Sequence, residues 1–211
     1  GEAATQLAQM SDQYIDLIIT DPPYLVGYRD RHGRSIANDE NPDAVLPAFP
    51  QMARVLRNNR YMILFCGWSA IDQFSATWTS AGLRTVGQIF WHKSYTSSSW
   101  HTECRHESAW LLAKGFPAKP SIPVSDVQEW ACSGNRNHPT EKAVNILAPL
   151  VRAYSKPGDV VLDPFSGSGS TSVAAALNNR RYLGIELDEG YCQHARNRII
   201  GVMRYLQLKA T

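Results

Sequence analysis

The sequence has few cysteines, and their positions exclude several kinds of protein. Four occur in 211 residues, namely Cys66, Cys104, Cys132 and Cys192. They form no CxxC pair and accompany no secretory leader, so we expect no disulfide framework and a reduced, cytoplasmic setting.

Long apolar runs and a strong charge imbalance are also absent. No run approaches the roughly 20 apolar residues that a membrane-spanning helix needs, so we expect a soluble protein without a membrane partner. With 21 Lys and Arg against 19 Asp and Glu, the net charge is +2. This balance permits a nucleic-acid partner without arguing for one. The length and the 44% hydrophobic content fit a single globular domain.

The order of apolar segments predicts an α/β fold. Short runs typical of buried strands occur at Tyr14–Thr20, Arg60–Cys66, Arg84–Trp91, Ser108–Ala113, Asp159–Asp163 and Arg181–Leu187. Segments with helical spacing occur at Phe49–Arg57, Ala70–Ala81, Thr140–Ser155, Ser170–Leu177 and Asp188–Ile200, where Asp188 is the expected N-cap. Their alternation predicts a doubly wound, mostly parallel sheet with helices on both faces.

Two polar stretches interrupt this alternation and are candidate functional loops. Val26–Asp43 contains Arg29, Arg31 and Arg34, which either face solvent or contact phosphates. Tyr95–Asn137 is rich in Ser, Pro and Trp. Four tryptophans are expected to pack rather than to read bases, namely Trp91, Trp100, Trp110 and Trp130.

A glycine turn indicates a nucleoside site. "VVLDPFSGSGSTSVAAALNN" places a strand, Asp163, Gly167, Gly169 and a helix in succession. Ligands of open α/β sheets bind beyond the carboxyl ends of the strands, where glycines let the backbone approach them closely. The next strand ends at Glu186, about where a dinucleotide fold keeps the acid that binds ribose hydroxyls.

The same turn lacks features that phosphate-rich ligands need. Ser172 stands where GxGxxG requires its third glycine, and the sequence has no GxxxxGK[ST]. These absences argue against NAD and ATP. S-adenosylmethionine has a ribose and an adenine but no pyrophosphate, so it fits the turn and the acid better.

A second unusual segment is "IITDPPYLVGY", at Ile18–Tyr28. Asp-Pro-Pro alone is ordinary turn chemistry, because proline fixes φ and restricts the residue before it. However, if the strands before Asp21 and Asp163 are parallel, both carboxylates emerge at one edge of the sheet. A methyl donor at one would face a substrate at the other.

Taken together, these motifs resemble the amino-methylating DNA methyltransferases, which make N6-methyladenine or N4-methylcytosine. DPPY spans Asp21–Tyr24, HPTEK spans His138–Lys142, and DPFSGSGST spans Asp163–Thr171. The catalytic motif precedes the donor motif, as in the permuted β class. The resemblance covers almost the whole chain and implies one class I methyltransferase domain over 1–211, with a Rossmann-like fold and a short target-recognition insert at about 95–137.

The resemblance also implies roles for particular residues. The target base is expected to meet Asp21, Pro22, Pro23 and Tyr24. S-adenosylmethionine is expected to meet Glu2, Asp163, Pro164, Phe165, Ser166, Gly167, Gly169, Thr171 and Glu186, with Glu186 on the ribose hydroxyls and the helix start at Thr140 flanking the donor. The implied partner is double-stranded DNA, and a homodimer is a further expectation because it would widen the DNA footprint.

The chemistry gives DPPY a physical reason. The exocyclic amine of adenine or cytosine is a poor nucleophile, because its lone pair is delocalised into the ring. Asp21 can accept one N–H and the Pro22 carbonyl the other, which favours a tetrahedral nitrogen. Tyr24 offers a ring on which a flipped base can stack, typically worth about 1–3 kcal/mol. Methylation of cytosine C5 needs a Pro-Cys nucleophile, which the sequence lacks.

Several alternatives remain beside the favoured N6-adenine target. Asp at the first motif position is commoner in adenine enzymes, yet N4-cytosine stays open. A protein glutamine methyltransferase would have Asn-Pro-Pro-Tyr and the donor motif first, and a non-catalytic DNA-binding subunit needs neither motif intact. His101 and Glu103 match the H-x-E of zinc deaminases, but the partner P-C-x-x-C is absent. Cys104, His106, Cys132 and His138 lack finger spacing, so no metal is predicted.

Overall fold

The computed structural model describes residues 1–28, 33, 35–99, 101–130 and 142–210. Its strands are β1 (Ile15–Thr20), β2 (Leu56–Phe65), β3 (Leu83–His92), β4 (Ser98–Ser99), β5 (Glu103–Cys104), β6 (His106–Lys114), β7 (Val127–Glu129), β8 (Val160–Asp163) and β9 (Arg181–Gly184). Its helices are α1 (Ala3–Ala8), α2 (Pro42–Val45), α3 (Ala48–Val55), α4 (Ile71–Ser80), α5 (Val144–Tyr154), α6 (Ser170–Leu177) and α7 (Glu189–Ala210). Within these ranges no helix combines the length and the apolar character needed to cross a bilayer.

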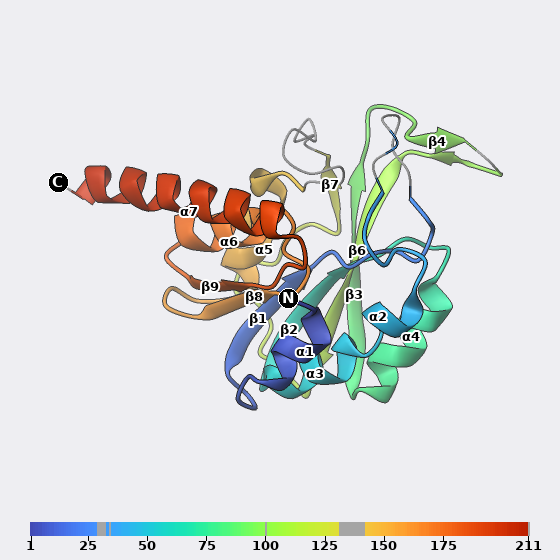
Figure 1. The fold of residues 1–211 in the computed structure, drawn as a ribbon, viewed down its shortest axis with the longest axis horizontal. Coiled ribbons are helices and arrows are strands. Elements are labelled where there is room, and N and C mark those ends of the chain that lie inside the picture. The colour runs from blue at the N-terminus through green and yellow to red at the C-terminus, as the bar shows by residue number, and fades with distance from the viewer. Residues whose placement is uncertain (29–32, 34, 100, 131–141, 211) are drawn as a thin grey trace.

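The main sheet has the strand order β7-β3-β6-β2-β1-β8-β9. Strand β1 pairs in parallel with both β2 and β8, and the β8–β9 and β3–β7 pairs are parallel too. Helices α1, α3 and α4 lie on one face, and α5 and α6 lie on the other (Figure 1). The predicted doubly wound, mostly parallel α/β fold is therefore confirmed.

Strand β6 runs against the direction of its neighbours. It pairs antiparallel with both β2 and β3, and the connection at 93–105 returns the chain beside β3 with no helix among its described residues. Parallel neighbours need a crossover connection, which is usually an α-helix. The small β4–β5 ribbon lies within this connection.

The position of β6 corrects one expectation about the predicted insert at 95–137. β6 lies inside that range but is an inner strand of the main sheet. Its apolar run is buried at Ala109, Leu112 and Ala113, which excludes a continuous excursion from the sheet. Within the predicted range 95–137, β6 thus separates residues 95–105 from the segment that follows Lys114.

Several predicted boundaries also differ. β2 begins at Leu56, directly after α3, rather than at Arg60, and β9 ends at Gly184 rather than at Leu187. The last helix continues to Ala210, ten residues past the predicted end at Ile200. Its predicted N-cap is confirmed, because Asp188 Oδ1 accepts a hydrogen bond from the Tyr191 N–H at 2.9 Å.

The residues of β1 show why the sheet is buried on both faces. Ile18 belongs to the core formed with α1, α3 and α4, whereas Leu17 and Ile19 belong to the core formed with α5 and α6. Side chains alternate between the faces of a strand, so a continuous apolar run supplies both cores. All six residues of β1 are buried.

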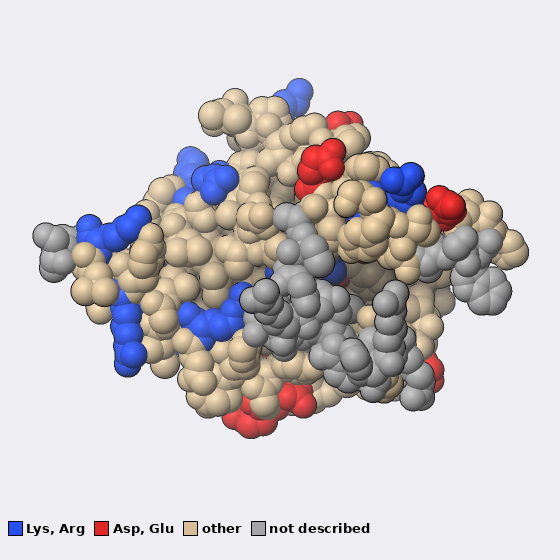
Figure 2. Space-filling view, turned by 90° about the horizontal axis from the view of Figure 1, so that it is seen from above, with Lys and Arg blue, Asp and Glu red and all other residues tan. Residues whose placement is uncertain are grey.

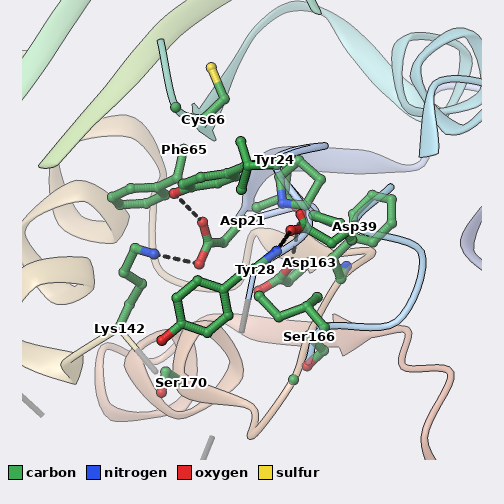
Figure 3. A pocket seen from close by; sticks show the side chains of 18 of the residues that line it. Asp21, Tyr24, Tyr28, Asp39, Phe65, Cys66, Lys142, Asp163, Ser166 and Ser170 are labelled. Atoms are coloured by element: carbon green, nitrogen blue, oxygen red, sulfur yellow. Dashed lines mark hydrogen bonds and ion pairs between the residues drawn. The ribbon is translucent and has the colours of Figure 1, made fainter. Parts of the chain in front are cut away.

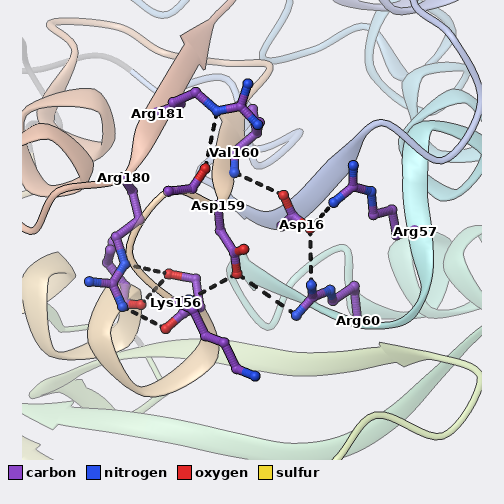
Figure 4. A network of polar contacts seen from close by, with 11 residues as sticks. Asp16, Arg57, Arg60, Lys156, Asp159, Val160, Arg180 and Arg181 are labelled. Atoms are coloured by element: carbon purple, nitrogen blue, oxygen red, sulfur yellow. Dashed lines mark hydrogen bonds and ion pairs between the residues drawn. The ribbon is translucent and has the colours of Figure 1, made fainter.

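A buried acid fixes the alignment of the central strands at the edge opposite the predicted site (Figure 4). Asp16 Oδ1 accepts hydrogen bonds from Arg57 at 2.5 Å and from Arg60 at 3.1 Å, and Oδ2 accepts one from the Val160 N–H at 2.9 Å. Arg60 also lies 3.8 Å from Asp159. A charge this deeply buried requires such partners. The network therefore holds β2, β1 and β8 in the register that places Asp21 beside Asp163.

Candidate functional site

A cavity of about 1080 Å³ lies at the carboxyl ends of the central strands. Its volume is at the upper end of the usual range for small-molecule sites. Asp21 follows β1 and Asp163 ends β8, which is one of the two parallel neighbours of β1. The Thr20 hydroxyl donates to Asp163 Oδ1 at 3.0 Å. The two predicted motifs therefore do share one edge of the sheet.

Both oxygens of the Asp21 carboxylate have partners (Figure 3). The Tyr24 hydroxyl donates to Oδ1 at 2.7 Å, and the Lys142 ammonium donates to Oδ2 at 2.5 Å. The ammonium also lies 5.7 Å from the ring centroid of Tyr24 and 5.1 Å from that of Phe65. Asp21 is thus held in one orientation between a phenol and a buried cation.

Burial and charge act together on the pKa values of these partners. Burial, followed by the nearby negative charge of Asp21, raises the pKa of the Tyr24 hydroxyl well above its ordinary value. Burial alone would lower the pKa of Lys142, but the charges of Asp21 and Glu107 outweigh it and raise that pKa. Lys142 therefore remains a cation and Tyr24 a hydrogen-bond donor.

Sequence reasoning assigned no role to Lys142. Its only signal was its place as the last residue of HPTEK. The other four residues of that motif, Thr140 among them, lie outside the described residues. The contact joins residues 121 positions apart, and no local pattern encodes such a distance. Only the packing of the segment before α5 against the end of β1 reveals it.

A second residue missed by sequence reasoning is Asp39, which braces the loop after Tyr24. Its buried carboxylate accepts hydrogen bonds from the Leu25 N–H at 3.0 Å and from the Tyr28 N–H at 2.6 Å. Leu25 has a φ of +61°, which is rare for a side chain of its kind. Asp39 compensates this strain and fixes the path of the chain beside the DPPY motif. Arg29, Arg31 and Arg34 lie outside the described residues.

The glycine turn has the conformation its residues suggest. Gly167 and Gly169 have φ values of +50° and +81°, and the Gly169 N–H donates to the Ser166 carbonyl at 2.9 Å. A Cβ on Gly169 would lie 2.7 Å from the Cβ of Ala195 in α7. Both the backbone conformation and the close approach of α7 therefore require glycine at this position.

The predicted acids at the far end of the cavity both accept hydrogen bonds, and Glu186 is anchored to the backbone. Glu186 Oε2 accepts a hydrogen bond from the Gly167 N–H at 2.7 Å, and Oε1 accepts bonds from the N–H groups of Leu187 and Asp188, each at 2.9 Å. Glu2 accepts a hydrogen bond from the Thr5 hydroxyl at 2.8 Å. All predicted catalytic residues line the cavity, and so do all predicted donor residues except Gly169, which shapes the turn from behind.

Asp163 has the most perturbed carboxyl group of the site. Burial raises its pKa to about 7, although hydrogen bonds from Thr171, the Phe165 N–H and Thr20 oppose the shift. A carboxyl of this kind changes its charge near neutral pH. Its ionised form would be favoured by a cation placed in the cavity.

The raised pKa of Asp163 predicts a pH-dependent stability. The pKa of Asp163 is about 7 in the native state and 3.8 ordinarily, so the protonated carboxyl favours the folded state. This contribution to the free energy of unfolding is full below pH 3.8 and is lost as pH rises through 7. Asp163→Asn cannot ionise and should escape this loss. Relative to the parent, its free energy of unfolding should increase by about 1–3 kcal/mol between pH 5 and pH 8. Urea unfolding of both proteins without ligand measures this difference.

The matched control for that experiment is Asp126→Asn, which alters an exposed carboxylate. It should leave the pH dependence of the unfolding free energy unchanged. If Asp163→Asn behaves like this control, the native state does not hold a proton on Asp163.

Other predicted features lie at or outside the site. Among the described residues, no group of three or more His, Cys, Asp or Glu side chains could hold a metal ion, while Cys132 and His138 lie outside them. Trp91 stacks on Phe65 in the core and Trp110 packs against Trp78, as expected. Trp130 lines the cavity instead, and Trp100 lies outside the described residues.

Comparison with known proteins agrees with this geometry. The chain is 47% identical over 207 residues to the "Putative methylase YubD" of Escherichia coli (strain K12), covering 98% of this chain and 91% of the relative. The structure of M1.HpyAVI in complex with SAM has a TM-score of 0.73 at 23% identity, covering 94% of this chain and 96% of the other. The cytosine-N4-specific PvuII DNA methyltransferase has a TM-score of 0.76 at 16% identity, covering 94% and 84%. At these identities the two structures show a shared fold.

A family model adds the decisive match. The model of the N6/N4 methyltransferases, described as DNA methylase, matches residues 15–197. This range contains DPPY, the glycine turn and Glu186. The chain therefore belongs to the DNA methylase family of N6/N4 methyltransferases.

Proposed function

We propose that the protein transfers a methyl group from S-adenosylmethionine to the N6 amino group of adenine in double-stranded DNA. The observation that carries this proposal is the Asp21 carboxylate, held by Tyr24 and Lys142. It lines the same cavity as Gly167 of the glycine turn and Glu186.

The residues at that end suit S-adenosylmethionine. When bound, S-adenosylmethionine supplies an electrophilic methyl group on a positively charged sulfur. The buried Asp163 carboxyl, with its raised pKa, suits a cationic ligand, because a nearby positive charge favours its ionised form. Glu186 is anchored by three backbone N–H groups at the cavity wall, where it can accept hydrogen bonds from ribose hydroxyls. Phe165 and the turn at Gly167 complete this end.

Asp21 and Pro22 activate the target amine. The Asp21 carboxylate accepts one N–H of the amine and the Pro22 carbonyl accepts the other, which localises the nitrogen lone pair away from the ring. Lys142 keeps Asp21 oriented, and Pro23 keeps the Pro22 carbonyl in place by restricting the backbone. The base must leave the duplex to reach this position, and Tyr24 offers its ring for stacking.

The choice of adenine rests on the motif rather than on the fold. Asp at the first motif position favours adenine among the enzymes that the sequence resembles. The PvuII enzyme shows that the same fold also serves cytosine N4, so N4-methylcytosine is the alternative product. Either product leaves the roles of Asp21, Pro22 and Tyr24 unchanged.

The proposed partner is duplex DNA, and a homodimer would extend the bound length. On the face seen in Figure 2, the described Lys and Arg side chains lie at several separate places and do not form one broad patch. This agrees with the net charge of +2. We assign DNA contact to the segments that contribute residues to the cavity wall, at 93–105 and after Lys114.

Incubation with labelled S-adenosylmethionine tests this function. Unmethylated duplex DNA and a protein extract are offered in parallel, and the labelled DNA is digested to nucleosides. We expect label in DNA as N6-methyldeoxyadenosine. Detection of N4-methyldeoxycytidine would change the assigned target base from adenine to cytosine and keep the mechanism. Label confined to protein would overturn the assignment.

A further inference from the structure

Part of the cavity wall consists of residues outside the predicted motifs. It contains Phe65, Lys93, Tyr95, Glu107 and Trp130, and we call this set the Lys93 lobe. These residues come from the end of β2, the start of β6 and the segments that follow β3 and β7. The lobe therefore lies on the side of Asp21 opposite β8 and β9 in the strand order.

A buried ion pair occupies the wall of this lobe. The Lys93 side chain is only 5% exposed and forms an ion pair with Glu107. Its ammonium also donates to the Ser97 hydroxyl at 3.2 Å. An ammonium has three N–H groups, and these two are its hydrogen-bond partners among the described residues. A third N–H is thus available to a molecule in the lobe.

Aromatic rings surround the same ammonium. Lys93 Nζ lies 5.9 Å from the ring centroid of Tyr95 and 5.7 Å from that of Trp130. Backbone hydrogen bonds fix this arrangement, since the Trp130 N–H donates to the His92 carbonyl at 2.8 Å and the Lys93 N–H donates to the Arg105 carbonyl at 2.8 Å. The lobe combines flat apolar faces with one oriented donor, which is how a flipped base is usually read.

The position of the lobe relative to the reacting groups limits what it can receive. The donor residues Asp163 and Glu186 belong to the β8 and β9 side of Asp21. An in-line displacement needs the donor and the nucleophile on opposite sides of the moving group. The target base must therefore approach from the β2, β6 and β3 side. The charge of Glu107 raises the pKa values of Tyr24 and Lys142, so this acid lies within electrostatic reach of both.

We propose that the Lys93 lobe receives the ring of the flipped target base, and that the Lys93 ammonium donates a hydrogen bond to an acceptor atom on that ring. Glu107 is a positioning residue that holds the ammonium, and Tyr95 and Trp130 contact the base faces. This inference rests on the proposed function, because it presumes that Asp21 binds the target amine.

The pattern of acceptor and donor selects among the bases. Asp21 offers an acceptor to the exocyclic amine, and Lys93 offers a donor elsewhere on the ring. Adenine and cytosine carry one amine, and the other polar ring atoms available to a protein are acceptors. Thymine has no exocyclic amine for Asp21, and guanine carries an N–H donor at the ring nitrogen beside its amine, where adenine and cytosine carry an acceptor. The lobe thus suits adenine and cytosine.

The test uses Lys93→Met and the double variant Lys93→Met/Glu107→Gln. The double variant removes both charges, so it leaves no unpaired charge in the lobe. We expect S-adenosylmethionine to bind both variants within twofold of the parent dissociation constant. With a duplex that carries the recognised site, kcat/KM should fall at least tenfold. The fluorescence of 2-aminopurine at the target position should rise less on binding than it does with the parent, because the flipped base is held less firmly.

A base analogue identifies the contact directly. Duplexes in which the target adenine lacks one ring nitrogen, as 1-deaza-, 3-deaza- or 7-deazaadenine, are compared with the natural duplex, and 3-deazacytosine is used if cytosine is the target. One of these analogues should lower kcat/KM at least tenfold for the parent and less than twofold for Lys93→Met. Equal losses in both proteins for every analogue would overturn the proposal.

Matched controls separate this result from other failures. Lys156→Met and Asp72→Asn change exposed charges outside the cavity and should leave kcat/KM unchanged. A parent enzyme without activity on any DNA would refute the proposed function itself. An active parent whose Lys93 variants keep full kcat/KM would refute only the role of the Lys93 lobe.

Discussion

Replacing Asp21 by alanine is expected to lower kcat at least about 1,000-fold. The dissociation constant for S-adenosylmethionine should remain within about threefold of the parent value, because the proposed donor contacts come from β8, β9 and the glycine turn. The reason for the loss is chemical: without a carboxylate the target amine keeps its lone pair in the ring. Single-turnover methylation and equilibrium binding of the donor measure the two quantities separately.

A control for Asp21→Ala must account for Lys142, since this variant leaves the buried ammonium without its carboxylate. The double variant Asp21→Ala/Lys142→Met removes that unpaired charge and should be equally inactive. Asp72→Ala, at an exposed position in the first turn of α4, should keep parent activity. Measurable turnover by a folded, donor-binding Asp21→Ala protein would refute the role assigned to Asp21.

The second large effect is expected for Lys142→Met. We expect kcat to fall about 100-fold, because Asp21 loses the cation that orients it opposite Tyr24. The free energy of unfolding should fall by about 1–3 kcal/mol, less than for a fully buried pair, because the Asp21 side chain is 19% exposed. Rapid-quench kinetics and urea unfolding measure the two changes.

The conservative variant distinguishes positioning from simple loss of structure. Lys142→Arg retains the charge, so its kcat should be at least tenfold higher than that of Lys142→Met. It should stay below the parent value, because the larger planar guanidinium fits the space less well. Lys156→Met is the surface control. If Lys142→Met instead weakens donor binding more than tenfold while kcat at saturating donor is unchanged, Lys142 belongs to the donor site and not to Asp21.

The motifs of this chain could be recognised in the sequence because each depends on a few adjacent residues. A glycine turn after a strand depends on Gly167 and Gly169, whose positive φ values only a few residue types tolerate. The DPPY tetrapeptide is stiff because of its own prolines. Continuous apolar runs predicted buried parallel strands, and β1 and β8 do pair in parallel. From these elements the sequence predicted both the fold class and the meeting of Asp21 with Asp163.

The sequence did not predict strand directions or side-chain contacts that depend on packing between residues far apart in the chain. The antiparallel direction of β6 follows from the connection at 93–105, which returns the chain beside β3. The prediction treated most of this connection as part of an insert at 95–137. Asp39 has no motif, and its role appears only where it binds the N–H groups of Leu25 and Tyr28. Lys93 and Glu107 meet because β3 and β6 pair with a particular register. A one-residue slip of that register would turn one of these side chains to the other face.

The sequence by itself therefore determined the class of fold, the two motifs and the order in which they occur, because each depends on bond geometry and periodicity within a few residues. Only the tertiary structure decided which charges face the reacting carboxylate. Lys142 reaches Asp21 across 121 residues, and Lys93 is held beside Glu107 at the wall of the cavity. Such contacts are fixed by packing in three dimensions, since a buried charge is stable only where the fold brings it a partner.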